Sequence, residues 1–133
     1  MKLLLDTCAL LWALQDTARL SPAARRELKD PKNSISVSVV SFLEIGIKSG
    51  LGKLILREAE PEDIPRFVGE VGWEIAPLSA DVAASAGRLP RPTEHRDPFD
   101  RLLVWTAIRE DYVLVSRDNA MRIYSPHGLK VCW

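Results

Sequence analysis

Short apolar segments alternate with helical segments along the whole chain, and this alternation constrains the fold more than any other feature of the sequence. Hydrophobic runs and polar–apolar alternation predict strands at residues 3–5, 34–39, 73–76, 113–116 and 129–132. Helices are predicted between them at residues 7–15, 22–29, 42–49, 61–71, 79–87, 98–108 and 119–124. This order predicts an α/β fold with a central, mostly parallel sheet of four to five strands, flanked by helices on both faces.

Serine and proline residues mark several of the predicted helix ends. Ser41 is expected to cap the helix at 42–49, and Asp97-Pro98 is expected to begin the helix at 98–108. Residues 88–96 are predicted to form a loop, because Pro90 and Pro92 break helical structure there.

Composition limits the classes of protein that this chain can represent. With 133 residues, 47% of them hydrophobic and 27% charged, we expect a single globular domain over residues 1–133. The formal net charge is +0, so contacts with nucleic acid must come from a local basic cluster. Asp6 interrupts the N-terminal apolar run, and no segment is long enough to span a membrane; we therefore expect a cytoplasmic protein. Cys8 and Cys132 lack metal or redox spacing and are expected to be reduced thiols.

Acidic residues occur where apolar strands end or helices begin. Asp6 follows the strand at 3–5, and Asp118 follows the strand at 113–116; Glu44 and Asp100 lie in predicted helices, with Asp97 as a fifth candidate. Because the carboxyl ends of parallel strands meet at one edge of a sheet, these carboxylates are expected to form one metal site. Mg²⁺ and Mn²⁺ prefer oxygen ligands of this kind. Crowding of the carboxylates should raise some of their pKa values when no metal is bound.

Each acidic residue also has a purely structural interpretation. Asp6 and Asp97 are favoured helix N-caps, and Asp100 would then meet the positive end of the helix dipole. Asp118 could be a turn residue, and Glu44 could lie on a solvated helix face. The apolar residues on both sides of Glu44 favour burial instead, where a carboxylate needs a partner.

Four segments resemble the PIN-domain family of metal-dependent ribonucleases, and most closely the VapC-like toxins of type II toxin–antitoxin pairs. The segments are Leu4-Leu5-Asp6-Thr7, Ser41-Phe42-Leu43-Glu44-Ile45, His95-Arg96-Asp97-Pro98-Phe99-Asp100-Arg101 and Leu114-Val115-Ser116-Arg117-Asp118. The resemblance implies a PIN-like fold and an endoribonuclease that uses Mg²⁺ or Mn²⁺ and inhibits translation or growth. It also implies that Asp6, Glu44, Asp100 and Asp118 are the catalytic and metal-binding residues, supported by Asp97, Ser116 and Thr7. Its implied partners are an RNA substrate, a cognate antitoxin and a second copy of the chain in a homodimer, with no membrane contact.

Basic residues around the acidic segments are candidates for RNA contacts. We expect such contacts through the phosphate backbone, although each side chain could equally be a solvated surface group. The candidates are Lys48, Arg96, Arg101 and Arg117. His95 and His127 lack ligand-like spacing, and His95 is expected to contact RNA or a loop.

Apolar residues in the first and third predicted helices could form partner surfaces or belong to the core. They are Leu10, Leu11, Trp12, Leu14, Leu51 and Leu54.

Two other enzyme classes and one non-enzymatic class compete with the nuclease interpretation. A haloacid-dehalogenase-like phosphatase has a second aspartate two residues after the first, where this chain has Cys8. A receiver-like domain would need paired acids after the first strand, and only Asp6 stands there. The remaining alternative is a catalytically inactive PIN-fold scaffold that binds RNA or protein, and the presence of all four acids argues against it.

Overall fold

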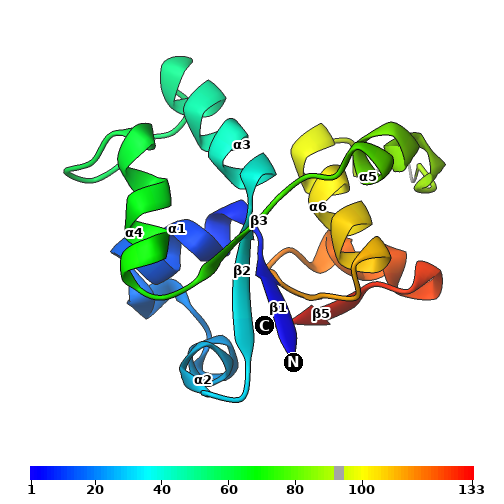
Figure 1. Cartoon of the computed structure of the whole chain (residues 1–133), viewed down its shortest axis with the longest axis horizontal. Coiled ribbons are helices and arrows are strands. Elements are labelled where there is room, and N and C mark those ends of the chain that lie inside the picture. Colours follow the sequence, from blue (N-terminus) through cyan, green and yellow to red (C-terminus); the bar gives the residue numbers. More distant parts are fainter. Residues whose placement is uncertain (92–94) are drawn as a thin grey trace.

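A five-stranded sheet forms the centre of the computed structural model, which describes residues 1–91 and 95–133 (Figure 1). The strands are β1 (Lys2–Leu5), β2 (Ser34–Ser38), β3 (Glu74–Ala76), β4 (Val113–Val115) and β5 (Lys130–Cys132). They lie in the order β3-β2-β1-β4-β5, and every pairing is parallel, so the predicted mostly parallel sheet is confirmed in a stricter form. In the central strand β1, Leu5 lies opposite both Val37 and Val115.

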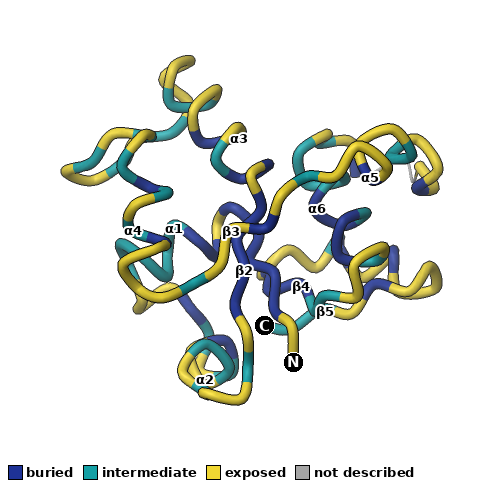
Figure 2. Tube along the Cα trace, viewed as in Figure 1, coloured by how far each residue is buried: buried dark blue, intermediate teal, exposed yellow. Residues whose placement is uncertain are grey.

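Both faces of the sheet are buried, as expected for parallel strands (Figure 2). Leu3 and Leu5 of β1 point into one core cluster, whereas Leu4 belongs to the cluster on the other face. Helices α1 (Thr7–Gln15), α2 (Pro22–Lys29) and α4 (Ile64–Glu70) supply the first cluster. The second cluster is supplied by α6 (Pro98–Arg109) and the 3-10 helix η4 (Asn119–His127), with α5 (Ala80–Ser85) packed on α6. The prediction of helices on both faces is therefore confirmed.

The segment after β2 differs from its prediction. Helix α3 (Val39–Gly50) begins at Val39, and the Ser38 hydroxyl caps it by accepting from the Val40 N–H at 3.0 Å. The β-branched pair Val39-Val40 resembles strand sequence, but burial of Val40 in the second core cluster favours the helical conformation. The prediction that Ser41 caps this helix is therefore wrong, and Ser41 is instead completely buried inside it.

Other helix boundaries agree more closely with the sequence. Helix α6 begins at Pro98, and Asp97 caps it by accepting from the N–H groups of Phe99 and Asp100 at 2.9 and 3.1 Å. The 3-10 helices η2 (Pro61–Asp63) and η3 (Ala86–Arg88) extend α4 and α5, and η1 (Thr17–Arg19) follows α1. Within the predicted loop at 88–96, residues 92–94 lie outside the described residues.

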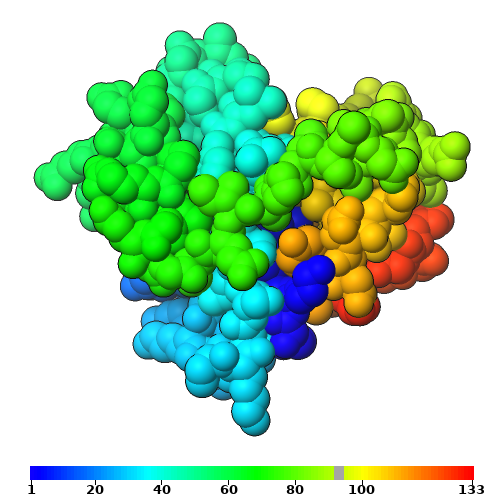
Figure 3. All heavy atoms as spheres, in the orientation of Figure 1, coloured from blue at the N-terminus to red at the C-terminus, as the bar shows by residue number. Residues whose placement is uncertain are grey.

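The chain forms the sheet outward from the central strand β1, first on one side and then on the other. From β1 it passes outward through β2 to β3, and it then returns over α5 and α6 to β4 and β5 on the other side of β1. Figure 3 shows the segment from β3 to α5 (green) running across the viewed side of the molecule in front of the central strands, with α4 to its left. None of the helices in the described part of the chain is long and apolar enough to cross a membrane.

Candidate metal site

A cavity of about 490 Å³ is lined by residues that follow β1 and β4, the two strands between which the strand order reverses. Ligands of open α/β sheets bind at such a reversal, beyond the carboxyl ends of the strands. Its lining includes the four predicted acids, Asp6, Glu44, Asp100 and Asp118, together with Thr7, Cys8, Lys48 and Arg117. The structure thus brings the predicted carboxylates to one place, although they come from four separate segments.

Asp6 lies at the end of the central strand and is buried. Its Oδ1 accepts from the Ala9 N–H at 2.7 Å, so the predicted capping role is present alongside the place in the cavity. Burial raises the pKa of Asp6 to about 6; hydrogen bonds from Ser116 and Ala9 oppose this rise, and the charges of Glu44 and Asp118 add to it. A carboxylate held this way gains from a nearby cation.

Glu44 extends from α3 and is 5% exposed, which excludes the solvated-face interpretation. The Thr7 hydroxyl donates to its Oε1, and the Lys48 ammonium donates to its Oε2. Thr7 Oγ1 also bonds Ser41 Oγ at 3.1 Å, so Ser41 belongs to the group of residues that orients Glu44. Sequence reasoning assigned Ser41 to helix capping and missed this role, which only the contact between α1 and α3 creates.

Asp97 and Asp100 stand together at the start of α6. Asp97 caps the helix through Oδ1, and its Oδ2 lies 3.5 Å from the Lys48 ammonium. Burial and, to a smaller extent, the charges of Asp97, Glu44 and Asp6 together raise the pKa of Asp100 to about 7, against the opposing effect of Lys48. The predicted rise in carboxylate pKa is confirmed, with burial rather than charge repulsion as its largest cause.

Asp118 and Ser116 approach the cavity from the end of β4. Asp118 caps η4, because its Oδ1 accepts from the Ala120 N–H at 2.9 Å, and the side chain is 45% exposed. Ser116 is buried; its hydroxyl bonds Asp6 and accepts from the Asp118 N–H at 3.1 Å. Ser116 therefore links the two acids that follow neighbouring strands.

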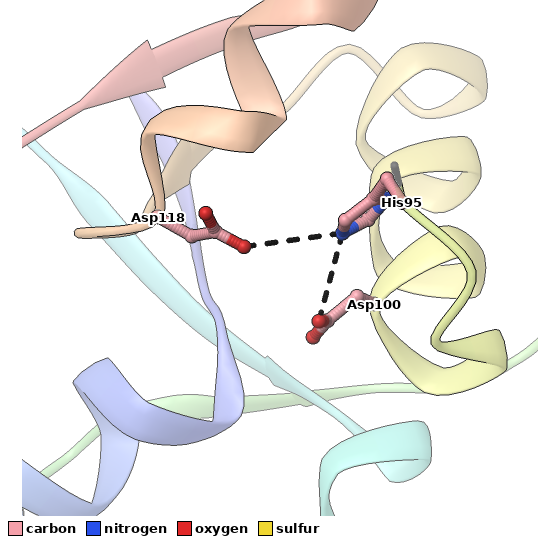
Figure 4. A group of neighbouring side chains, drawn as sticks. All are labelled: His95, Asp100 and Asp118. Atoms are coloured by element: carbon pink, nitrogen blue, oxygen red, sulfur yellow. Dashed lines mark ion pairs between the residues drawn. The ribbon is translucent and has the colours of Figure 1, made fainter. Parts of the chain in front are cut away.

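His95 is a member of the site that the sequence analysis did not place there. The side chain is 6% exposed, and its Nε2 lies 3.6 Å from Asp100 Oδ2 and 3.9 Å from Asp118 Oδ2 (Figure 4). Its Nδ1 lies 2.7 Å from the Tyr124 hydroxyl. The RNA or loop contact stays a prediction, whereas the place of the buried ring beside Asp100 and Asp118 is new. The only signal for it in the sequence was the position of His95 shortly before Asp97-Pro98.

Two overlapping groups in the described residues could hold a divalent ion. Glu44, Asp97 and Asp100 can each place one oxygen within 4.8 Å of the others, and His95, Asp100 and Asp118 can do the same with one nitrogen and two oxygens. Asp100 belongs to both groups. Carboxylate oxygens and a buried imidazole nitrogen are suitable ligands for a hard or borderline divalent cation.

The thiol of Cys8 is unsuited to a role as a charged ligand. Partial removal from water and the charges of Asp6, Glu44 and Asp100 raise its pKa to about 11. The thiol therefore stays protonated near neutral pH, whereas metal ligation and nucleophilic attack require the thiolate.

The four basic residues predicted to contact RNA have different environments. Lys48 donates to Glu44, and the Arg101 guanidinium donates to the carbonyls of Leu89 and Pro90 and to the Tyr124 hydroxyl. Lys48 therefore fixes the position of Glu44, and Arg101 fixes Tyr124 and the backbone at Leu89 and Pro90.

Arg117 and Arg96 are both exposed. Arg117 lies 5.8 Å from the Trp12 ring at the edge of the 490 Å³ cavity, and Arg96 lines a neighbouring cavity of about 740 Å³. Both arginines border a cavity that a ligand could enter.

Metal-free protein should lose stability as pH rises, because two carboxyl groups have an elevated pKa in the folded state. Between about pH 4 and pH 7 the unfolded chain releases these protons first, so the free energy of unfolding falls with rising pH. Asp100→Asn removes one of the two groups. In thermal unfolding with chelator, its Tm should exceed that of wild type by an amount that grows from about pH 4 and levels off above about pH 7. A Tm difference that is constant with pH would contradict the environment described for Asp100.

The PIN domain family model matches residues 3–125 of the chain. Comparison with curated proteins gives no match. Among solved structures, the chain is similar to VapBC2 from Rickettsia felis bound to a DNA fragment from their promoter, with 19% identity, a TM-score of 0.66, and coverage of 99% of this chain and 98% of that one. It is also similar to DNA-bound VapBC from Salmonella typhimurium, with 18% identity, a TM-score of 0.67, and coverage of 99% and 97%.

A toxin–antitoxin complex from Klebsiella pneumoniae is similar at 20% identity, with a TM-score of 0.57 and coverage of 98% of this chain and 95% of that one. At these identities the likeness of all three structures shows a common fold.

Proposed function

Because this chain belongs to the PIN domain family, we propose that it is a Mg²⁺- or Mn²⁺-dependent endoribonuclease whose residues 1–133 form a single PIN domain. The observation that carries the proposal is the convergence of Asp6, Glu44, Asp100 and Asp118 on one cavity. Burial raises the pKa of both Asp6 and Asp100, so the folded protein holds carboxyl groups in a setting that a bound cation would stabilise. A catalytically inactive PIN-fold scaffold would not require four carboxylates to line one cavity.

A divalent ion bound by these acids would supply an activated water and neutralise charge on the phosphate and the departing oxygen. The remaining contributions come from the side chains of the chain itself. Thr7 and Lys48 fix the two oxygens of Glu44, Ser116 fixes Asp6, and Asp97 sets the start of α6 and thereby the position of Asp100. Since the Asp100 carboxyl retains its proton up to about pH 7, ion binding must release that proton and should strengthen with rising pH.

Single-stranded RNA is the substrate class that the rim of the cavity suits. Trp12 lines the cavity and carries the Arg117 guanidinium 5.8 Å from its ring, which provides an aromatic surface for a base beside a cation for a phosphate. Arg96 in the neighbouring cavity would extend the path of the RNA backbone. These cations offset the repulsion between the acidic site and the phosphates.

Arg117→Ala should weaken RNA binding to a similar degree for different sequences, because phosphate contacts carry little sequence information. The dependence of log K on log salt concentration should become shallower by about 0.7 for the lost contact with a single strand. The measurement is a salt titration of binding to a fluorescent oligoribonucleotide in the presence of chelator, which prevents cleavage. Arg66→Ala on α4, where Arg66 pairs with Asp63 and Glu70, is the matched control and should keep the wild-type slope.

We also propose that the protein is the toxin of a toxin–antitoxin pair and that its activity inhibits translation or growth. The similarity to VapBC complexes supports this proposal. An exposed apolar ridge along α3 and its C-cap residue also supports it: Leu43, Ile47 and Leu51 follow one another at four-residue spacing and are 58%, 43% and 64% exposed. This ridge is our candidate for contact with an antitoxin or with a second copy in a homodimer, whereas Leu10 is buried in the core.

The nuclease proposal is tested by incubating the antitoxin-free protein with total cellular RNA and, separately, with single-stranded DNA. Cleavage of RNA at discrete sites with Mn²⁺ or Mg²⁺, abolished by chelator, is the expected result. Intact RNA after incubation with folded, ion-loaded protein would favour the scaffold alternative. Preferential cleavage of DNA would contradict the assignment of RNA as substrate.

A further inference from the structure

The His95 ring is buried beside the acidic cavity with one nitrogen that has no hydrogen-bond partner among the described residues. That atom is Nε2, and the whole residue is only 6% exposed. Figure 4 shows the ring directed toward the carboxylates of Asp100, in α6, and of Asp118, the residue that caps η4. Buried polar atoms almost always have a partner, so an unpaired nitrogen at this position indicates a missing ligand.

The distances around Nε2 fit a shared ion better than a direct hydrogen bond. Nε2 lies 3.6 Å from Asp100 Oδ2 and 3.9 Å from Asp118 Oδ2, beyond the usual range for hydrogen bonding. An ion that is about 2.1 Å from each ligand can join atoms up to about 4.2 Å apart. Both separations in the structure are below that limit.

The other side of the ring is held in the orientation that metal-binding histidines require. Nδ1 lies 2.7 Å from the Tyr124 hydroxyl, and that hydroxyl accepts from the Arg101 guanidinium at 3.0 Å. When Nδ1–H donates to Tyr124, the lone pair of Nε2 faces the two carboxylates. Partners of this kind fix both the tautomer and the direction of a ligating imidazole.

We propose that His95 Nε2 is a ligand to a divalent ion that it shares with Asp100 and Asp118, and that this ligand makes the site prefer Mn²⁺ to Mg²⁺. The inference rests on the proposed metal-dependent function and adds a nitrogen donor to its oxygen donors. Mg²⁺ takes oxygen ligands almost exclusively, whereas affinity for sites of mixed nitrogen and oxygen donors increases along the first-row transition metals that begin with Mn²⁺. His95 thereby sets which ion the site retains.

The test is pulsed electron paramagnetic resonance of Mn²⁺ bound to the full chain. Coupling between Mn²⁺ and an imidazole ¹⁴N nucleus is expected in wild type. Labelling the histidines with ¹⁵N should replace this ¹⁴N coupling with a ¹⁵N coupling. The chain has two histidines, so His127→Asn is the control and should keep the coupling. This measurement on wild-type protein does not depend on whether a variant at position 95 folds.

Calorimetry of His95→Asn gives an independent readout. Its affinity for Mn²⁺ should fall at least about 10-fold, a loss comparable to that seen when the support of a metal ligand is removed. Its affinity for Mg²⁺ should change much less, so the preference for Mn²⁺ should decrease. Equal losses for both ions would overturn the inference.

The outcomes separate this inference from the proposed function. Wild-type protein that binds Mn²⁺ without nitrogen coupling would refute His95 as a ligand and leave the nuclease proposal intact. In that case the ring would only be an ionic partner of Asp100 and Asp118. Wild-type protein that binds neither Mn²⁺ nor Mg²⁺ would overturn both.

Discussion

Asp100→Asn should lower metal-dependent RNA cleavage roughly 10³-fold, because it removes a carboxylate from a site that works by concentrating charge around a phosphate. Asp100 belongs to both groups of residues that can surround an ion. Its neighbours Asp97, Glu44 and Asp6 all raise its pKa, so the neutral asparagine relieves repulsion in the metal-free protein. The variant should therefore be folded, with a Tm at pH 8 no lower than that of wild type in the presence of chelator.

Asp111→Asn is the matched control for this prediction. Asp111 is exposed, pairs only with Lys130 among the described residues and has a φ of 57°, a conformation that asparagine tolerates. An exposed ion pair contributes little to stability, so this variant should cleave RNA at the wild-type rate. Equal rates for Asp100→Asn and wild type would remove Asp100 from the mechanism.

Glu44→Gln should lower cleavage about 10²-fold, since glutamine keeps the shape of the side chain but loses its charge. The Thr7 hydroxyl can still donate to the amide oxygen, and Lys48 retains Asp97 as a partner at 3.5 Å, so the fold around α3 should persist. Glu44→Asp should retain part of the cleavage activity. Glu44→Leu should be no more active than Glu44→Gln. The measurement is the initial rate of cleavage of one RNA at several Mn²⁺ concentrations.

The control for Glu44 is Glu70→Gln on α4. Glu70 is exposed and pairs with Arg66 at 2.9 Å, so the same chemical change there should leave the rate unaltered. If Glu44 acts by holding an ion, high Mn²⁺ should recover part of the rate of Glu44→Gln. Full activity of Glu44→Leu would contradict any role for this carboxylate.

The parallel sheet and most helices could be predicted from the sequence because local signals agree with the tertiary structure there. Leu3 to Leu5 form a continuous apolar run, as expected for a strand buried on both faces. Asp97 is a favoured N-cap residue and Pro98 a favoured first helical residue, so together they indicate the start of α6. The start of α3 was predicted too late because Val39 and Val40 carry β-strand propensity. Burial of Val40 in the second core cluster, which no local pattern reports, favours the helical conformation, whereas Val39 stays exposed.

The candidate site could be predicted only in part, because some of its residues follow from the strand pattern and others come together only through tertiary packing. Asp6 and Asp118 follow strands whose ends must meet in a parallel sheet, so their convergence is a consequence of topology. His95 was missed because its relation to Asp118 depends on the packing of η4 against α6, where Tyr124 anchors the ring. Lys48 is four residues after Glu44 on one helix face, and that spacing already allowed an ion pair instead of an RNA contact.

Anomalous diffraction from crystals of the full chain soaked in Mn²⁺ tests most directly whether the acidic cavity binds metal. We expect an anomalous peak inside the 490 Å³ cavity, within bonding distance of an Asp100 carboxylate oxygen. A cavity without a peak, with Glu44 still bound to Lys48 and with Asp100 and Asp118 unliganded at saturating Mn²⁺, would contradict this expectation.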